Sequence, residues 1–256
     1  MSNATGRFVW YELMTSDPKA AEAFYRGVVG WSARDAGMPG MSYTLLSADG
    51  ADIGGLMALP SEARAAGAEP GWIGYVAVDD ADARAEQAAQ QGGSVQRAPA
   101  DIPGVGRFAV IADPQGAVLA LFKGAGEMRA PVPAGTPGHG GWHELLAADQ
   151  AAVFDFYAGL FGWSKAESFD MGEMGIYQLF ALDGESIGGM MSKPEAVPAP
   201  FWLYYFNVGG IDAAEARVEA GGGRIVNGPM EVPGGQWIVQ CRDPQGAMFA
   251  LLAPRR

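Results

Sequence analysis

The 256-residue sequence has little cysteine and little histidine: Cys241, His139 and His143 are the only residues of these two types. One cysteine excludes a disulfide framework, and so few Cys and His side chains exclude a zinc site built mainly from them. Histidine is also the side chain best suited to proton transfer near neutral pH. The sequence therefore offers little material for imidazole-based catalysis or metal binding.

Positive charge and long apolar runs are also scarce. Lys and Arg number 17 against 29 Asp and Glu, which gives a formal net charge of −12. This charge disfavours binding to nucleic acids and to anionic membranes. No apolar run approaches the roughly 20 residues that span a bilayer, and residues 1–6 lack the apolar core of a signal peptide. With 49% hydrophobic residues, we expect a soluble, cytoplasmic, globular protein with no nucleic-acid or membrane partner.

The sequence does contain an internal duplication, whose two copies are offset by 130 to 134 residues. Trp-x-Glu-Leu, Phe-Tyr, Gly-Trp-Ser, Ile-Gly-Gly and Asp-Pro-Gln-Gly-Ala each occur twice and in the same order. The matching segments are residues 8–13 and 140–145, 23–25 and 155–157, 29–32 and 161–164, 53–55 and 187–189, and 113–117 and 243–247. A repeat of this length indicates two homologous domains. We expect them at residues 1–124 and 138–256, joined by a Pro- and Gly-rich linker at 125–137.

Each repeat shows the pattern strand, helix and three strands, twice over. Asp17-Pro18 predicts a helix start, because Asp is a favoured N-cap and Pro a favoured first helical residue. The other helices are expected at 82–91, 150–160 and 212–220. In the first repeat the strands are expected at 7–13, 41–47, 53–59, 72–78, 94–98, 107–112 and 117–123. The fold class is therefore α+β, with two βαβββ modules in each domain.

The βαβββ pattern and the ordered, duplicated motifs resemble the vicinal oxygen chelate superfamily, which includes glyoxalase I, extradiol dioxygenases and bleomycin-resistance proteins. The resemblance covers essentially the whole chain and implies two tandem glyoxalase-like domains. In that superfamily, paired modules curl their sheets into a cup that holds the ligand. A cup may form within a domain or between modules exchanged across domains, and the sequence leaves both arrangements open.

The resemblance also implies where metal ligands would lie: on the first, fourth, fifth and last strand of each domain. In this sequence those positions hold Trp10, Gly55, Ile73 and Ala120, and Trp142, Gly189, Leu203 and Ala250. None of these side chains carries an atom that binds a divalent cation. The sequence therefore predicts no metal and no other cofactor.

Strand alternation gives expectations for the histidines. His143 follows Trp142 and should point to the opposite face of the strand, where it would be a partly buried replacement for Tyr11. His139 is expected in an exposed loop. A metal site formed by the two histidines is the less favoured alternative.

Glu12 and Glu144 lie two residues after Trp10 and Trp142, so each Trp and Glu should share the face that looks into the cup. A carboxylate in an apolar cavity can act as a general base or a hydrogen-bond acceptor. The favoured alternative is structural: the carboxylate accepts backbone N–H groups or an Arg and orders the strand.

Further residues with the same alternation complete the predicted ligand-binding set. The whole set is Trp10, Glu12, Ile73, Tyr75, Ala120, Phe122, Trp142, Glu144, Leu203, Tyr205, Asn207 and Ala250. Such an aromatic surface with a few hydroxyl groups is typical of small-molecule pockets, although part of it would serve equally well as core. Trp72 and Trp202 have the opposite alternation and should lie beneath the helices. Arg107 is expected on the surface and Cys241 as buried filler.

The sequence thus favours a metal-free protein that binds a small apolar or aromatic molecule in a sheet-lined cup. One alternative is an enzyme of the superfamily, such as a lyase, isomerase or dioxygenase, with an unusual or absent metal site. The other is a structural or protein-interaction role. We expect a monomer with paired domains or a homodimer.

Overall fold

The computed structural model describes residues 4–126 and 132–256, and consists of four consecutive βαβββ modules. The predicted linker therefore lies partly outside the described residues. Module 1 contains β1 (Phe8–Thr15), α1 (Pro18–Val28), β2 (Ser32–Asp35), β3 (Tyr43–Ala48) and β4 (Ala51–Ala58), and the short helix α2 (Ser61–Ala65) follows it. Module 2 contains β5 (Gly71–Ala77), α3 (Ala81–Gln90), β6 (Ser94–Ile102), β7 (Gly106–Ala112) and β8 (Val118–Gly124).

The second repeat has the same element order. Module 3 contains β9 (Gly140–Ala147), α4 (Gln150–Phe161), β10 (Ser164–Asp170), the single 3-10 turn η1 (Gly172–Met174), β11 (Ile176–Leu182) and β12 (Glu185–Ser192). Module 4 contains β13 (Phe201–Asn207), α5 (Ile211–Ala220), β14 (Arg224–Val232), β15 (Gln236–Arg242) and β16 (Met248–Ala253). The predicted α+β class and the four βαβββ modules are confirmed.

The helices α1, α3, α4 and α5 begin within one residue of their predicted starts, whereas the short helix α2 was not predicted. Asp17 caps α1 by accepting the backbone N–H of Ala20 at 3.1 Å, and Pro18 is the first helical residue. Asp80 and Asp149 cap α3 and α4 in the same way. Such caps satisfy backbone N–H groups that have no partner within the helix. The observed bounds of α3, α4 and α5 differ from the predicted ones by one residue at most.

The strands of each repeat form one eight-stranded sheet, in the order β2-β3-β4-β1-β5-β8-β7-β6 and β10-β11-β12-β9-β13-β16-β15-β14. β1 pairs in parallel with β4, with Tyr11 opposite Gly54, and β5 pairs in parallel with β8, with Tyr75 opposite Ala120. The modules of a repeat meet at their first strands: the N–H of Ala77 donates to the carbonyl of Arg7 at 2.9 Å. Both modules of a repeat therefore contribute to the same sheet.

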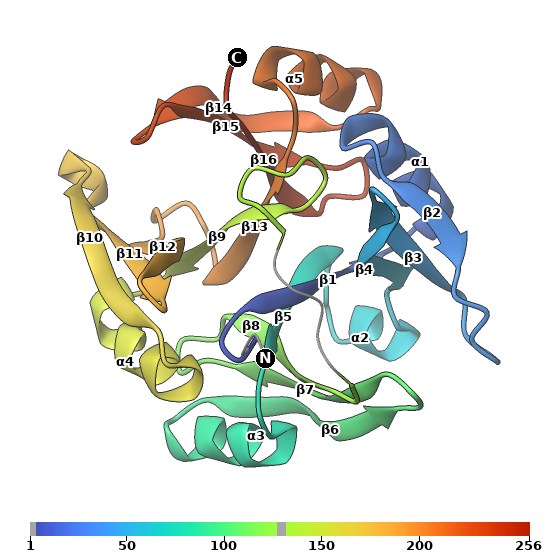
Figure 1. Cartoon of the computed structure of the whole chain (residues 1–256), viewed down its shortest axis with the longest axis vertical. Coiled ribbons are helices and arrows are strands. Elements are labelled where there is room, and N and C mark those ends of the chain that lie inside the picture. The colour runs from blue at the N-terminus through green and yellow to red at the C-terminus, as the bar shows by residue number, and fades with distance from the viewer. Residues whose placement is uncertain (1–3, 127–131) are drawn as a thin grey trace. The chain divides into compact units, whose positions relative to one another are not determined.

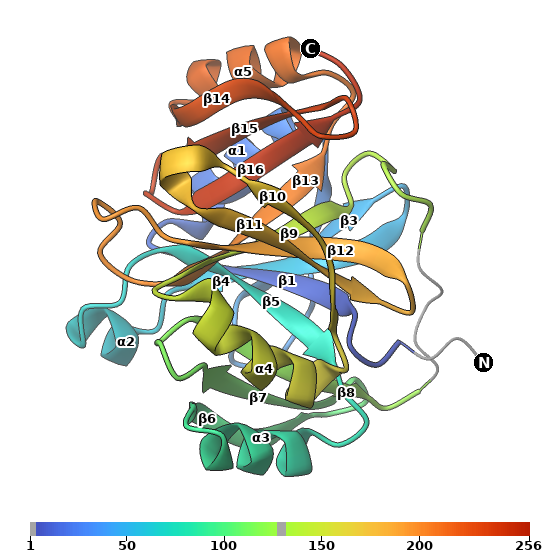
Figure 2. The same cartoon turned by 90° about the vertical axis from the view of Figure 1, so that its left-hand side faces the viewer.

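The compact units of the chain draw on both repeats. Among the described residues, the first unit comprises 4–9, 73–126 and 143–202, which is mainly module 2 with module 3. The second comprises residues 10–72, 132–142 and 203–256, which is mainly module 1 with module 4. In the first unit α3 packs on β6, β7 and β8 (Figure 1). In the second, α5 packs on β14, β15 and β16 (Figure 2).

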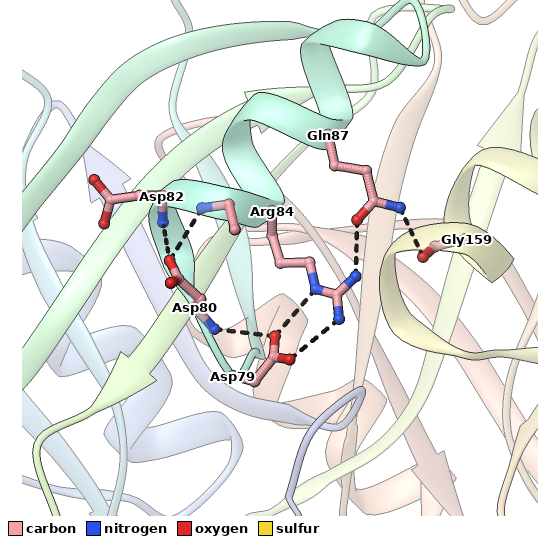
Figure 3. Close-up of polar contacts among 7 residues, drawn as sticks. Asp79, Asp80, Asp82, Arg84, Gln87 and Gly159 are labelled. Carbon is pink, nitrogen blue, oxygen red and sulfur yellow. Dashed lines mark hydrogen bonds and ion pairs between the residues drawn. The ribbon is translucent and has the colours of Figure 1, made fainter.

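Polar side chains join α3 to α4 within the first unit (Figure 3). Arg84 donates to both carboxylate oxygens of Asp79, at 3.1 and 3.3 Å, and to the amide oxygen of Gln87 at 2.7 Å. The amide nitrogen of Gln87 then donates to the carbonyl of Gly159, near the end of α4, at 3.0 Å. One helix thereby satisfies a terminal carbonyl of the other.

The second unit joins α5 to α1 with a charged group instead. The Arg217 guanidinium donates twice to the carbonyl of Val28, at 3.0 and 2.9 Å. Val28 is the last residue of α1. A cation at a helix C-terminus also interacts favourably with the helix dipole.

The core of each unit contains the same buried polar contact. In the first unit Tyr157 donates to Asp113 at 2.8 Å and accepts the indole N–H of Trp202 at 3.1 Å. In the second unit Tyr25 donates to Asp243 at 3.1 Å and accepts the indole N–H of Trp72 at 2.9 Å. The expectation that Trp72 and Trp202 lie beneath the helices is confirmed, and both are buried.

These contacts explain the repeated Asp-Pro-Gln-Gly and Phe-Tyr motifs. Asp243 accepts the N–H groups of Gln245 and Ala247, both at 2.9 Å, and so orders its own turn while it receives Tyr25. Burial raises the pKa of Asp243, and the hydrogen bonds from the backbone and from Tyr25 act in the opposite direction. The turn of one repeat is thus tied to the helix of the other repeat.

Candidate ligand-binding faces

The first strand of the chain carries a hydrogen-bonded group of three side chains. The indole Nε1 of Trp10 donates to the hydroxyl of Tyr43 at 3.2 Å. That hydroxyl donates in turn to Oε2 of Glu12 at 2.9 Å. All three side chains are half-buried, whereas Tyr11 and Leu13, which alternate with them on β1, are buried. The prediction that Trp10 and Glu12 share a face is confirmed, and Tyr43 lies on that face too.

A glycine makes room for Tyr43. Gly55 lies opposite Glu12 in the β1–β4 ladder, and a Cβ atom on Gly55 would overlap the Tyr43 hydroxyl. Tyr177 lies against Gly189 in the same manner in the first unit. The second glycine of each Ile-Gly-Gly motif therefore accommodates a tyrosine ring over the sheet.

Burial raises the pKa of the Tyr43 phenol well above its usual range, and the neighbouring Glu12 charge raises it further. Tyr43 therefore keeps its proton at any physiological pH and remains a hydrogen-bond donor to Glu12. Glu144, the equivalent of Glu12 in the second repeat, is buried with 6% of its surface exposed.

The module 2 face is aromatic. Tyr75 lies opposite Ala120 in the β5–β8 ladder, and its ring contacts Phe108 and Phe122 with centroids 6.2 and 6.4 Å apart. The guanidinium of Arg97 lies over the Phe108 ring at 4.7 Å. The structure therefore brings together three predicted site residues, Tyr75, Ala120 and Phe122. Ile73, on the same strand, is half-buried.

The module 4 face carries an amide in addition to its tyrosine. Ala250 lies between Tyr205 on β13 and Gln240 on β15 in the ladder. Gln240 reaches past this small residue and donates to the Tyr205 hydroxyl at 2.8 Å. Its amide oxygen accepts a longer hydrogen bond from Asn227, at 3.4 Å.

Two other predicted residues on β13 are deeply buried, Leu203 with 0% and Asn207 with 4% of its surface exposed. The backbone of Asn207 bonds to Gly138 and His139, before β9. Its side chain lies so close to Gly141 that a Cβ there would overlap it. Asn207 thus connects β13 to β9. Trp142, on β9, is half-buried.

A divalent metal does not fit the positions that the superfamily resemblance indicates. Indole, aliphatic and glycine positions supply no donor atoms to Mn²⁺, Fe²⁺, Ni²⁺ or Zn²⁺. Within residues 4–126 and 132–256, no three His, Cys, Asp or Glu side chains are grouped closely enough to hold a metal ion.

The remaining candidates are accounted for by packing. His143 is buried, stacks on Phe8 with centroids 3.9 Å apart, and bonds through Nδ1 to the carbonyl of Ile187, so it is the expected replacement for Tyr11. His139 is half-buried, not exposed as predicted, because β13 pairs with its backbone. Cys241 is buried, which raises the pKa of its thiol to about 12. Arg107 forms surface ion pairs with Asp82 and Asp101.

Two residues on these faces were missing from the predicted set. Tyr43 recurs as Tyr177, each 12 residues before the second glycine of Ile-Gly-Gly, but strand alternation left the face of these tyrosines open. Gln240 has no such signal, since Val110 takes its place in the first repeat.

Comparison with known proteins decides the family. The model of the Glyoxalase/Bleomycin resistance protein/Dioxygenase superfamily matches residues 7–121 and 139–251, one match in each repeat. The chain belongs to this superfamily. Among similar proteins, DnrV of Streptomyces peucetius, named an anthracycline biosynthesis protein, is 32% identical over 267 residues, covering 98% of this chain and 94% of DnrV. CFP32 of Mycobacterium tuberculosis is 31% identical over 247 residues, covering 96% and 94% of the two chains.

Solved structures of the superfamily share the fold. The Mn(II)-bound glyoxalase of Novosphingobium aromaticivorans has a TM-score of 0.68 at 16% identity, covering 98% of this chain and 83% of its own. The 2,3-dioxygenase LapB of Pseudomonas sp. KL28 has a TM-score of 0.67 at 13% identity, covering 99% and 93%. Among the described residues, no helix has the length and apolar character required to cross a membrane.

Proposed function

We propose that this superfamily member binds a small apolar or aromatic molecule on the described sheet faces without a metal ion. The observation that carries the proposal is the replacement of the expected metal ligands by donor-free side chains, next to Tyr43, Tyr75, Phe122 and Tyr205 on the same faces. Aromatic rings with a few placed polar groups are the usual lining of a small-molecule site. The residues predicted from strand alternation to line the cup belong to this proposal.

The relatives support an aromatic ligand of some size. DnrV is named for the biosynthesis of anthracyclines, which are polycyclic aromatic compounds, and its similarity extends over nearly the whole chain. We extend this chemistry to the present chain as a class of ligand, a flat fused-ring compound, and not as a particular compound. The net charge of −12 favours a neutral or cationic molecule over an anionic one.

A thermal-shift experiment on tag-free, EDTA-treated protein tests the proposal. Naphthalene derivatives, flavone and anthraquinone are compared with cyclohexanol, an aliphatic control. Ligand at 100 times its Kd stabilises the folded state by about 2.7 kcal/mol, so aromatic compounds should raise Tm by several degrees. The proposal fails if no aromatic compound raises Tm, or if the rise appears only after Mn²⁺ is added.

A pair of tryptophan variants locates the binding. Trp10→Ala removes an indole from the proposed face and should weaken aromatic binding. Trp237→Ala is the matched control, because Trp237 is also a half-buried strand tryptophan but alternates with Ile238 and Gln240, and so lies on the opposite face of its sheet. It should leave the Kd unchanged. Equal loss in both variants would place the ligand elsewhere.

A further inference from the structure

Two connections between neighbouring strands each carry a pair of methionines three residues apart. Met38 and Met41 lie between β2 and β3, and Met171 and Met174 lie between β10 and β11. No other methionines in the sequence have this spacing. Methionine is usually a core residue, yet Met41, Met171 and Met174 are 39%, 40% and 54% exposed. Core packing therefore does not account for these methionines.

A backbone hydrogen bond closes each pair into one turn. The N–H of Met174 donates to the carbonyl of Met171 at 3.4 Å, and the N–H of Met41 donates to the carbonyl of Met38 at 3.3 Å. Such a turn brings the Cα atoms of its first and fourth residues within about 7 Å of each other. Methionine side chains are unbranched and rotate freely about their bonds, so the two sulfur atoms of a pair can reach a common ion.

The Met171–Met174 turn is held by further hydrogen bonds and carries negative charge. The N–H of Met171 donates to the carbonyl of Gly175 at 2.8 Å, and the N–H of Gly172 donates to Oδ1 of Asp170 at 2.9 Å. Among the described residues, no basic side chain forms an ion pair with Asp170 or Glu173. The turn is therefore ordered before any ligand binds, and its charge attracts cations.

Thioether sulfur is a soft ligand that favours Cu(I), whereas Mg²⁺, Ca²⁺ and Mn²⁺ prefer oxygen ligands. We propose that the Met171–Met174 turn binds Cu(I) through its two sulfur atoms, and that the Met38–Met41 turn is a weaker site of the same kind. The Met38–Met41 turn is the weaker one because residues 36–42 contain no charged side chain. This inference is independent of the proposed function, since none of these methionines belongs to the proposed binding faces.

Anaerobic titration of the full-length, tag-free protein with Cu(I), in competition with bicinchoninate, tests the proposal. It gives the affinity and the number of ions, which should be two per chain. Methyl NMR spectra of methionine-labelled protein with Ag(I), a soft cation that is stable in air, locate the ions. The methyl signals of Met171 and Met174 should shift first, and those of Met38 and Met41 at higher Ag(I) concentration. Mg²⁺ should shift none of them.

Leucine variants remove one sulfur atom at a time. Met171→Leu and Met174→Leu each retain an apolar side chain of similar volume. Each should weaken the tighter site by at least about 10-fold, because loss of even an outer-shell partner of a metal ion costs about 10- to 100-fold in affinity. Met230→Leu is the matched control, since Met230 is a half-buried strand methionine with no methionine three residues away. It should leave both affinities unchanged.

Several results would overturn the inference. No Cu(I) binding by the wild type, or unchanged binding in Met171→Leu and Met174→Leu, would show that the sulfur atoms are not ligands. Loss of binding in Glu173→Gln together with competition by Mg²⁺ would assign the ion to carboxylates. Loss of binding in Cys241→Ala would assign it to the thiol, but Cys241 is buried and this variant should bind as the wild type does.

Discussion

The two compact units use the same core contacts but have different sheet faces. Each unit has a Tyr–Asp hydrogen bond and an indole that donates to the same tyrosine. On the module 2 face of the first unit, Tyr75 is surrounded by Phe108 and Phe122. On the module 4 face of the second, Tyr205 is bonded to an amide. The repeated Tyr, Asp and Trp residues therefore build the same core contact in each unit, whereas residues that differ between the repeats, such as Phe122 and Gln240, change the chemistry of the faces.

On the first strands of the two repeats, a large side chain packs against a small residue, and the large and small residues change places between the repeats. In the second unit Tyr11 packs edge-on against Tyr204 and Phe206, and its hydroxyl occupies the space that a side chain at Gly140 would need. In the first unit the smaller His143 stacks on Phe8, which is the residue equivalent to Gly140. A large residue on one strand is thus matched by a small one nearby, as close packing requires.

The largest expected difference between the units is a pH effect of His143. Burial lowers the pKa of His143 to about 4, and the hydrogen bond to Ile187 only partly opposes this. In the unfolded chain the pKa of a histidine is near 6.5, so the unfolded state binds the proton first as the pH falls. The free energy of unfolding should therefore decrease by about 3 kcal/mol between pH 6.5 and pH 4. Denaturant unfolding at pH 7 and pH 4.5 measures this loss.

His143→Phe is the control for that experiment, because it retains an aromatic ring against Phe8 and removes the titrating group. Its stability should fall less between pH 7 and pH 4.5 than that of the wild type, since the carboxylates are common to both proteins. Identical pH dependence in the two proteins would show that His143 is not the source.

The close packing of Tyr11 against Gly140 gives the next largest expected change in stability. Gly140→Ala should destabilise the protein by about 1–3 kcal/mol, because the new methyl group overlaps Tyr11. Tyr11→His, which copies the second repeat, should recover part of this loss in the double variant. A double-mutant cycle in urea measures the coupling, and purely additive effects would contradict the packing account.

The shared core contacts predict equal costs in the two units. Tyr25→Phe and Tyr157→Phe each remove one hydroxyl that donates to a buried Asp and accepts from a buried Trp. Each should lower the free energy of unfolding by about 1–3 kcal/mol. A large cost for one substitution and none for the other would show that the two contacts are not equivalent.

The smallest expected difference concerns the helix pairs. Arg217→Ala removes two charged hydrogen bonds to the end of α1 and should cost about 1–2 kcal/mol. Gln87→Ala removes one neutral hydrogen bond to Gly159 and should cost about 0.5–1 kcal/mol. Thermal unfolding of both variants tests which substitution costs more. An equal or larger cost for Gln87→Ala would show that the Arg217 charge near Val28 contributes nothing.

Much of the fold could be predicted because the repeated motifs occur in one order. The alternation of Trp10 and Glu12 gave their face, and the opposite alternation of Trp72 gave its place beneath α1. The combination of module 1 with module 4 in one unit could not be predicted, because equivalent modules carry equivalent motifs and the pattern does not say which will pair.

The candidate site was less accessible to sequence reasoning. The bonds of Tyr43 depend on the close approach of its ring to Gly55, which alternation does not reveal. Gln240 reaches Tyr205 only because Ala250 between them is small, and this combination occurs in one repeat. Local patterns give the face of a residue, but three-dimensional contacts decide its partners.

Equilibrium dialysis of one aromatic probe, 2-naphthol, against protein stripped of metal and then supplied with Mn²⁺ tests metal-free binding most directly. Elemental analysis of the same samples gives the metal content. We predict the same Kd in both samples, with far less than one metal ion bound per chain. Binding that appears only with stoichiometric Mn²⁺ would contradict the account and return the chain to the metal-dependent members of its superfamily.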